Sequence, residues 1–376
     1  MKIGIIFGAG AERTFGLSGG KDFSKKVLGL NEEKMNDAVE KYHKNKELDN
    51  WYPSYCKHTW EKDKLLKAAL RKKYLEESKN YKTKQEFKDI INEQYDQIIQ
   101  RSEKEQDKLI DRYTSYMGIL DEKFHTLISP RELGPANFWK VIDAYTRAYL
   151  ALTENMISDD ISQHSNKYFW ILNNPKKANE YINKFCKEMS TIDSYYKIIK
   201  ECDKKDDFRI ITTNYTPLID IITDINNIAY LHGKLNWFES PREWKVYDVL
   251  NDELPNKELL FPYIFVQSGV KPIVEEKILM EYSKAIEYLH EVEKLIIVGY
   301  RLNFDDNHIN GLIRNYVLDG KSVIYLDFDN VSRRDILNRL RITQNFEKID
   351  FKRLSINNDN SLSVFKDSID FDHNKR

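Results

Sequence analysis

The first ten residues constrain the fold of this chain more than any other part of it. An apolar run at residues 3–7 ends in Gly8-Ala9-Gly10. A continuous apolar run of this length is typical of a strand buried on both faces, as the strands of parallel sheets are. The glycines then predict a tight turn. We therefore expect an α/β fold whose first strand is residues 3–7.

Four more runs with the composition of buried strands follow much later. They are short, rich in β-branched residues, and occupy residues 208–213, 228–231, 294–299 and 322–327. Segments with helical spacing lie between several of them, notably 274–292 and 308–318. Strands that alternate with helices predict a doubly wound parallel sheet, so the expected fold is a Rossmann-like core.

The segment between the first strand and the others has a different texture. Residues 31–204 are poor in Gly and Pro, and stretches such as 87–99 and 138–152 repeat apolar residues at helical spacing. The expected organisation is a core formed by 1–30 and 205–355, with 31–204 as a large helical insertion after the first strand. Residues 356–376 are polar and are expected to form a frayed tail.

Composition narrows the classes of partner. The 59 Lys and Arg residues nearly balance 60 Asp and Glu residues, which gives a formal net charge of −1. Such a chain has no global attraction to nucleic acid or to an anionic membrane, and no apolar run is long enough to cross a bilayer. Cys56, Cys186 and Cys202 include no C-x-x-C pair, so we expect a reducing cytoplasm, no disulfide framework and no metal site of the four-cysteine zinc type.

The glycine turn after the first strand is a candidate for binding a phosphate group. Gly8-Ala9-Gly10 would let backbone N–H groups approach a pyrophosphate at the start of a helix. The G-x-G-x-x-G pattern is incomplete, because Arg13 occupies its last glycine position and no acidic residue stands out about twenty positions further on. A strand that simply ends in a glycine turn is the alternative.

Polar residues also follow the next two predicted strands. Asn214 ends one of these strands and His232 ends the other. Ligands of open α/β sheets lie beyond the carboxyl ends of the strands. An amide there can hold a ribose hydroxyl or a water, and a histidine can act as a base near neutral pH, with Gly233 leaving room for the ligand. In the alternative interpretation, Asn214 caps the next helix and His232 is structural.

The last two predicted strands end in a similar way. Gly299 begins a polar turn, and Asp305 and Asp306 are placed to cap the helix near residue 308. Asp327 could bind ribose hydroxyls, or it could simply close a turn with Asn330. Each signal is weak alone. Their occurrence at the ends of successive strands of one sheet favours a nucleotide site.

Taken together, these residues resemble the sirtuin-like family, in particular its bacterial anti-phage branch. Three elements carry the resemblance over about 1–30 and 205–330. The glycine turn with Asp22-Phe23 is similar to the loop that closes over NAD, Thr212-Thr213-Asn214-Tyr215 to the Thr-Gln-Asn-Ile-Asp element, and His232-Gly233 to the His-Gly element. Gly299-Tyr300-Arg301-Leu302 matches the position of a Gly-Thr-Ser phosphate-binding turn.

The resemblance implies that NAD is the substrate and that the bond between nicotinamide and ribose is cleaved, which would deplete NAD in antiviral defence. Asn214 and His232 would be catalytic. The residues implied in NAD binding are Gly8, Ala9, Gly10, Asp22, Phe23, Thr213, Gly299 and Asp327.

Two departures from the family argue against an acyl-lysine substrate. The zinc cysteines are absent, and Glu12 stands where the family has a serine. A protein deacylase is therefore the less favoured of two alternatives. A non-catalytic nucleotide-binding sensor or structural subunit of a defence complex is the other, because a nucleotide fold does not imply turnover. Control is expected through a homo-oligomer or a co-encoded partner, such as a HerA-type ATPase or another sensor protein.

Overall fold

The computed structural model describes a parallel sheet assembled from both ends of the chain. It describes residues 2–17, 145–146, 148–157, 167–240, 245–255, 260–265, 273, 275–303, 306–329, 331–344 and 346–370. The sheet has six strands: β1 (Ile3–Phe7), β2 (Phe208–Thr212), β3 (Ile228–Tyr230), β7 (Lys294–Val298), β8 (Ser322–Asp327) and β9 (Phe351–Ser355).

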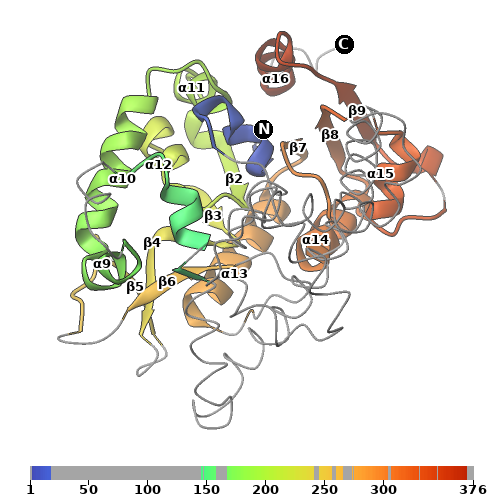
Figure 1. The fold of residues 1–376 in the computed structure, drawn as a ribbon. Helices are drawn as coiled ribbons and strands as arrows, with labels where there is room; N and C mark the ends of the chain where they lie inside the picture. Colours follow the sequence, from blue (N-terminus) through green and yellow to red (C-terminus); the bar gives the residue numbers. More distant parts are fainter. Residues whose placement is uncertain are drawn as a thin grey trace, which may run out of the picture.

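The strand order is the feature of the sheet that positions the site. Neighbouring strands lie in the order β3-β2-β1-β7-β8-β9, and every pair is parallel (Figure 1). Counted along the chain, this order is 3-2-1-4-5-6, that of doubly wound Rossmann sheets. The winding reverses between β1 and β7. The predicted α/β, Rossmann-like fold class is confirmed.

The centre of the sheet is apolar because its strands are covered on both faces. Ile5 of β1 pairs with Ile210 on one side and Ile296 on the other, and all three are fully buried. Apolar residues on both faces of the strands indicate that neither face of the sheet is exposed to solvent there. Although residues 3 and 208 are far apart in the chain, they are direct partners in the sheet.

Helices cover the sheet (Figure 1). They are α9 (Lys167–Asn173), α10 (Pro175–Met189), α11 (Tyr195–Lys200), α12 (Leu218–Thr223), α13 (Glu276–Glu291), α14 (Asn307–Leu318), α15 (Arg333–Arg339) and α16 (Ser361–Ile369). A 3-10 helix, Ala9–Phe15, follows β1 directly. The helices predicted at 274–292 and 308–318 are confirmed as α13 and α14.

Part of the segment expected as an insertion packs on this core. α10 and α11 contact α12, and Tyr196 and Ile199 of α11 are fully buried. Residues 145–146 and 148–153 are helical, with Tyr145 and Tyr149 buried, whereas the predicted helix at 87–99 lies outside the described residues.

The prediction of a frayed tail is wrong for residues 361–369. They form α16, because Phe365 and Ile369 share one face and are buried. The ring of Phe365 lies 6.1 Å from that of Phe7 in β1 and 5.1 Å from that of Tyr195. Residues 371–376 lie outside the described part of the chain.

A small antiparallel sheet follows His232 and was not predicted from the sequence. Its strands are β4 (Gly233–Ser240), β5 (Lys245–Asp248) and β6 (Phe261–Ile264), in the order β5-β4-β6. Gly233 has a φ of +84°, and a Cβ there would lie 3.0 Å from the Cα of Ile264. The expectation that Gly233 leaves room for a ligand is therefore wrong, since the backbone of β6 fills that space.

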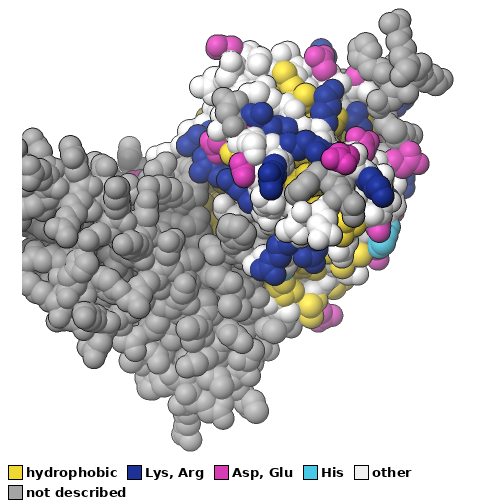
Figure 2. Space-filling model, turned by 90° about the vertical axis from the view of Figure 1, so that its right-hand side faces the viewer, with side chains coloured by type: hydrophobic (Ala, Val, Ile, Leu, Met, Phe, Trp, Pro, Cys, Tyr) yellow, Lys and Arg dark blue, Asp and Glu magenta, His cyan; other side chains and the backbone are white. Residues whose placement is uncertain are grey.

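Charged side chains of both signs are mixed on the side of the molecule that carries α15 and β9, where many Lys and Arg gather (Figure 2). The exposed charged residues of this segment include Arg334, Arg341, Lys348, Lys352, Asp335, Glu347 and Asp350. This mixture gives no field of a single sign. Among the described residues, no helix is both long and apolar enough to span a bilayer.

Candidate functional site

Two glycine turns meet where the winding of the sheet reverses. The N–H of Gly8 donates to Val298 O at 2.9 Å, and the N–H of Gly10 donates to Gly299 O at 3.0 Å. A Cβ on Gly8 would lie 2.6 Å from Gly299 O, and one on Gly10 would lie 2.8 Å from Gly299 Cα. The close packing of the two turns is thus enough to explain why Gly8, Gly10 and Gly299 have no side chain, without a bound ligand. Their role toward phosphate, and that of the exposed Ala9 beside them, stays a prediction.

Asn214 lies just beyond the carboxyl end of β2. Its backbone N–H donates to Thr212 Oγ1 at 3.0 Å, and its side-chain Nδ2 donates to the Tyr196 hydroxyl at 3.1 Å. The residue is 3% exposed, and its Oδ1 is buried without a hydrogen-bond partner in the described structure. The alternative that Asn214 caps the next helix is wrong, because Pro217 occupies the N-cap of α12. The amide is therefore held at one end and has an acceptor to offer at the other.

Thr213 ties the same strand end to β1. Its backbone N–H donates to Phe7 O at 3.0 Å, and its hydroxyl lies 3.4 Å from the same oxygen. Thr213 thus sets the position of Asn214 relative to the glycine turn. A direct role toward NAD stays a prediction.

Glu12 is a buried acid beside Asn214 that the sequence signalled only as a departure from the family. Its Oε1 accepts from the Tyr196 hydroxyl at 2.9 Å and from Thr216 Oγ1 at 2.6 Å. Burial raises the pKa of Glu12 to about 7, although hydrogen bonds from Thr216, Tyr196 and Asn214 act in the opposite direction. A carboxyl that titrates near neutral pH next to a polar cluster is a feature of functional sites.

His232 follows β3 and faces a carboxylate. Its Nε2 lies 3.2 Å from Asp306 Oδ1, an ionic approach without the geometry of a directed hydrogen bond. Both residues are buried, and the backbone carbonyl of His232 accepts from Phe265 N at 2.8 Å. Asp306 occupies the N-cap position of α14, as predicted, but its side chain makes no capping hydrogen bond. Asp305 lies outside the described residues.

Aromatic rings surround the imidazole. The rings of Tyr215 and Phe265 each lie 6.2 Å from that of His232, and the ring of His308 lies 6.1 Å away. Tyr215 is the residue after Asn214, and its ring is also a neighbour of the His232 ring. The two candidate catalytic residues thus follow adjacent, paired strands.

His232, Asp306 and His308 form a group of side chains that could hold a metal ion. One ligand atom from each lies within 4.8 Å of the other two. In a tetrahedral zinc site, bonds of about 2.0–2.3 Å place ligand atoms only about 3.3–3.7 Å apart. The 3.2 Å between His232 Nε2 and Asp306 Oδ1 is close to this spacing, so the three residues are compatible with a metal ion as well as with a histidine–carboxylate pair.

Asp327 ends β8 and is occupied by protein contacts. Its Oδ1 accepts from Asp329 N at 3.0 Å, and its Oδ2 accepts from Val331 N and from Arg353 Nε, each at 2.8 Å. The carboxylate closes a turn and pairs with β9. Binding of a ribose by Asp327 stays a prediction. Asp22 and Phe23 lie outside the described residues.

The remaining predicted residues therefore gather along one edge of the sheet. From β3 to β8, its carboxyl ends carry His232, Asn214 with Thr213, the glycine turn at residues 8–10, Gly299 and Asp327. Sequence reasoning missed Glu12 and Tyr196 as parts of the site and assigned Asp306 another role. Their contacts join residues distant in the chain, so no local motif marks them.

Comparison with known proteins finds similar solved structures, but only at low sequence identity and low TM-score. No protein-family model and no curated protein matches the chain. Among solved structures, a Sir2 homologue mutant in complex with ADP-ribose is 14% identical, with 50% of this chain and 81% of that chain covered and a TM-score of 0.29. A structure of Sir2Tm bound to a propionylated peptide is 16% identical over 45% of this chain and 73% of that chain, also with a TM-score of 0.29. A sirtuin studied for substrate affinity is 15% identical over 50% and 83%, with a TM-score of 0.30. At such low scores, the fold assignment rests on the strand order described above.

Proposed function

We propose that this protein hydrolyses NAD at the bond between nicotinamide and ribose. The observation that carries the proposal is the strand order 3-2-1-4-5-6, with Asn214 and His232 at the carboxyl ends of β2 and β3, on the β1 side of the reversal point. Sheets of this order bind dinucleotides across the crevice at that point. An amide acceptor and a histidine–carboxylate pair beside such a crevice supply what cleavage of a glycosidic bond requires.

The reaction balances without a further reactant. Water attacks the ribose carbon, the carbon–nitrogen bond breaks, and nicotinamide leaves with the bonding electron pair. The products are nicotinamide, ADP-ribose and one proton. The transition state has the character of an oxocarbenium ion, so positioning and charge stabilisation do most of the work.

Asn214 and His232 would divide this work. The buried Oδ1 of Asn214 accepts a hydrogen bond from a ribose hydroxyl or from the attacking water. His232 takes the proton, and the carboxylate of Asp306, 3.2 Å away, stabilises the resulting imidazolium. The rings of Tyr215 and Phe265 beside the imidazole limit the access of bulk water.

The rest of NAD would lie along the same edge of the sheet. In this proposal the diphosphate lies at the two glycine turns, Thr213 lines the pocket, and Asp327 faces the adenosine ribose. Asp22 and Phe23 belong to the loop that closes over the ligand. We further propose that this reaction depletes NAD in the cytoplasm as part of antiviral defence. Its activity would be controlled by formation of a homo-oligomer or by a HerA-type ATPase.

A second candidate is a non-catalytic nucleotide-binding sensor or a structural subunit of a defence complex. It is favoured by one observation, that the N–H groups of Gly8 and Gly10 and the carboxylate of Asp327 already have partners within the protein. A site built in this way could be architectural rather than catalytic.

Product analysis separates the candidates. The purified chain is incubated with NAD, alone and with the protein encoded beside it, and nicotinamide and ADP-ribose are quantified by liquid chromatography and mass spectrometry. The proposal predicts equal amounts of the two products. NAD that binds but stays intact in both cases would establish the second candidate. Release of nicotinamide only when an acylated peptide is present would identify a deacylase.

A further inference from the structure

Two hydrogen bonds link Glu12 to Asn214 through Tyr196. The Glu12 carboxylate accepts from the Tyr196 hydroxyl at 2.9 Å, and the oxygen of that hydroxyl accepts from Asn214 Nδ2 at 3.1 Å. Thr216 also donates to the carboxylate, at 2.6 Å. Glu12, Tyr196, Thr216 and Asn214 are each less than 5% exposed. The chain of bonds is therefore shielded from water.

The direction of these bonds fixes the orientation of the amide. A tyrosine hydroxyl has one proton, and Tyr196 gives it to Glu12. Its oxygen can then only accept, so the NH₂ group of Asn214, rather than its carbonyl, must face Tyr196. The Asn214 Oδ1 is thereby turned away from this cluster, and no donor among the described residues bonds to it.

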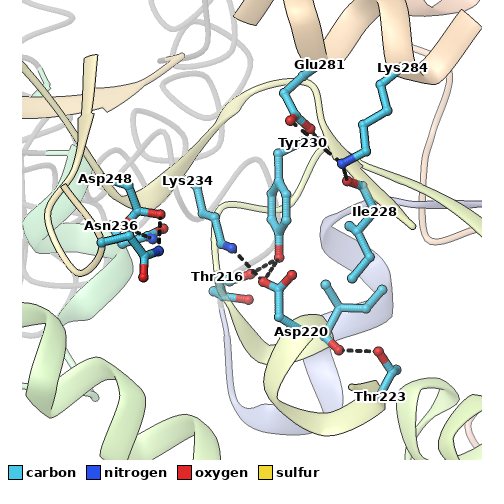
Figure 3. A network of polar contacts seen from close by, with 12 residues as sticks. Thr216, Asp220, Thr223, Ile228, Tyr230, Lys234, Asn236, Asp248, Glu281 and Lys284 are labelled. Carbon is cyan, nitrogen blue, oxygen red and sulfur yellow. Dashed lines mark hydrogen bonds and ion pairs between the residues drawn. The ribbon is translucent and has the colours of Figure 1, made fainter. Parts of the chain in front are cut away.

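Other contacts hold Thr216, the second hydrogen-bond donor to Glu12 (Figure 3). The Tyr230 hydroxyl lies 3.2 Å from Thr216 O and 2.6 Å from Asp220 Oδ2, and Lys234 Nζ pairs with the same Asp220 oxygen at 2.7 Å. The backbone of Thr216 is thus fixed by β3 and α12. Its hydroxyl donates to Glu12 from a fixed position.

We propose that Glu12 is a positioning residue of the site, which acts through Tyr196 to keep the Asn214 Oδ1 available to the substrate. The inference rests on the proposed function and deepens it. Glu12 itself touches neither substrate nor reacting atoms. Its loss would therefore change turnover more than NAD binding.

The surroundings of Glu12 make this orientation sensitive to pH. Tyr196 of α11, Cys186 of α10, Asp220 of α12 and Tyr230 of β3 interact electrostatically with Glu12 or with its partners. These groups are neutral or acidic, and the cation in the network, Lys234, pairs with Asp220. Burial raises the pKa of Glu12 to about 7, and no cation among the described residues pairs with its carboxylate directly. A protonated Glu12 can donate to Tyr196, so the amide loses its fixed orientation below that pH.

Kinetics of matched variants test the proposal. Tyr196→Phe removes the link, and Glu12→Leu removes the acceptor, so each should lower kcat by about 10- to 100-fold with KM for NAD within about threefold. Glu12→Gln keeps an acceptor for Tyr196 and Thr216. This variant should keep the wild-type kcat above pH 7. Below pH 7 its kcat should fall less than that of wild type, because a glutamine side chain does not titrate.

Tyr149→Phe is the matched control. The Tyr149 hydroxyl is also buried and accepts from an amide, Asn179 Nδ2, at 3.3 Å. Its removal should cost similar stability and leave kcat unchanged. Equal kcat in wild type, Tyr196→Phe and Glu12→Leu would overturn the proposal, as would a loss in Tyr149→Phe as large as in Tyr196→Phe.

A second measurement does not depend on activity. In protein labelled with ¹⁵N-asparagine, the side-chain amide signal of Asn214 is identified by its absence in Asn214→Ala. The signal should shift with a midpoint near pH 7 in wild type and stay constant in Glu12→Gln. If NAD is not cleaved but this titration is observed, the proposed reaction fails while the link between Glu12 and Asn214 stands. A signal that does not titrate in wild type overturns the link.

Discussion

The Nε2 of His232 lies 3.2 Å from Asp306 Oδ1, so a histidine at the end of β3 faces a carboxylate at the start of α14. If His232 is the base, Asp306→Asn should lower kcat about 10-fold or more, because a neutral amide cannot stabilise the imidazolium. Asp319→Asn, an exposed change at the other end of α14, is the control. Steady-state NAD cleavage measures both. An unchanged kcat in Asp306→Asn would remove Asp306 from the mechanism.

Glu12 should make the stability of the protein fall as pH rises. Its folded pKa of about 7 lies above the ordinary value of 4.5, so the folded state binds more protons between these two values. The contribution of Glu12 to the free energy of unfolding is then complete below pH 4.5 and is reduced by about 3 kcal/mol at pH 7. Glu12→Gln should be more stable than wild type by up to that amount at pH 8 and equal to it near pH 4. Urea unfolding of both proteins across this range would contradict the account if the two curves ran parallel.

Gly299 should tolerate no side chain. It has a φ of +67°, and a Cβ would lie 2.7 Å from the backbone carbon of Gly10. Gly299→Ala should cost about 3 kcal/mol or more, since strain adds to a backbone clash. Gly320→Ala is the control, because Gly320 has a φ of +79° with nothing within 4 Å. It should cost only about 1–2 kcal/mol. Thermal unfolding compares the two, and equal losses would mean that the turns do not pack as described.

Asp327 should stabilise the fold whatever its role toward NAD. Asp327→Asn breaks the pair with Arg353, whose side chains are 3% and 24% exposed, and should cost about 2 kcal/mol. Asp329→Asn removes an exposed pair with Arg301 and should cost less than about 1 kcal/mol. Urea unfolding gives the stabilities, and a smaller loss in Asp327→Asn than in Asp329→Asn would contradict the structural role. Titration with NAD on the folded variant then tests the predicted ribose contact separately.

The sequence predicted the sheet well because its strands carry a local signal. The runs at 3–7 and 294–299 are apolar apart from Lys294, as expected of strands buried on both faces, and they correspond to β1 and β7. The polar residues at the strand ends were also found in this way. Because the strands are parallel, their carboxyl ends lie at one edge of the sheet. Asn214 and His232, which come just after two of these strands, therefore lie at that edge.

The rest depended on contacts that no local pattern encodes. Tyr196 reaches Asn214 from a helix within the segment expected as an insertion, and Glu12 meets both only in the folded chain. β4 was missed because most of its residues are buried, so the alternation that marks a half-exposed strand is absent. The helix α16 was missed because it has few apolar residues and their burial depends on tertiary contacts, such as the packing of Phe365 on Phe7.

The most direct test of the central claim compares NAD cleavage by wild type, Asn214→Ala and His232→Ala. Asn315→Ala and His290→Ala, exposed positions on α14 and α13, are matched controls. The account predicts a loss of about 100-fold or more in both site variants, with unchanged rates in the controls and intact folds throughout. Folded site variants that cleave NAD at the wild-type rate would contradict it.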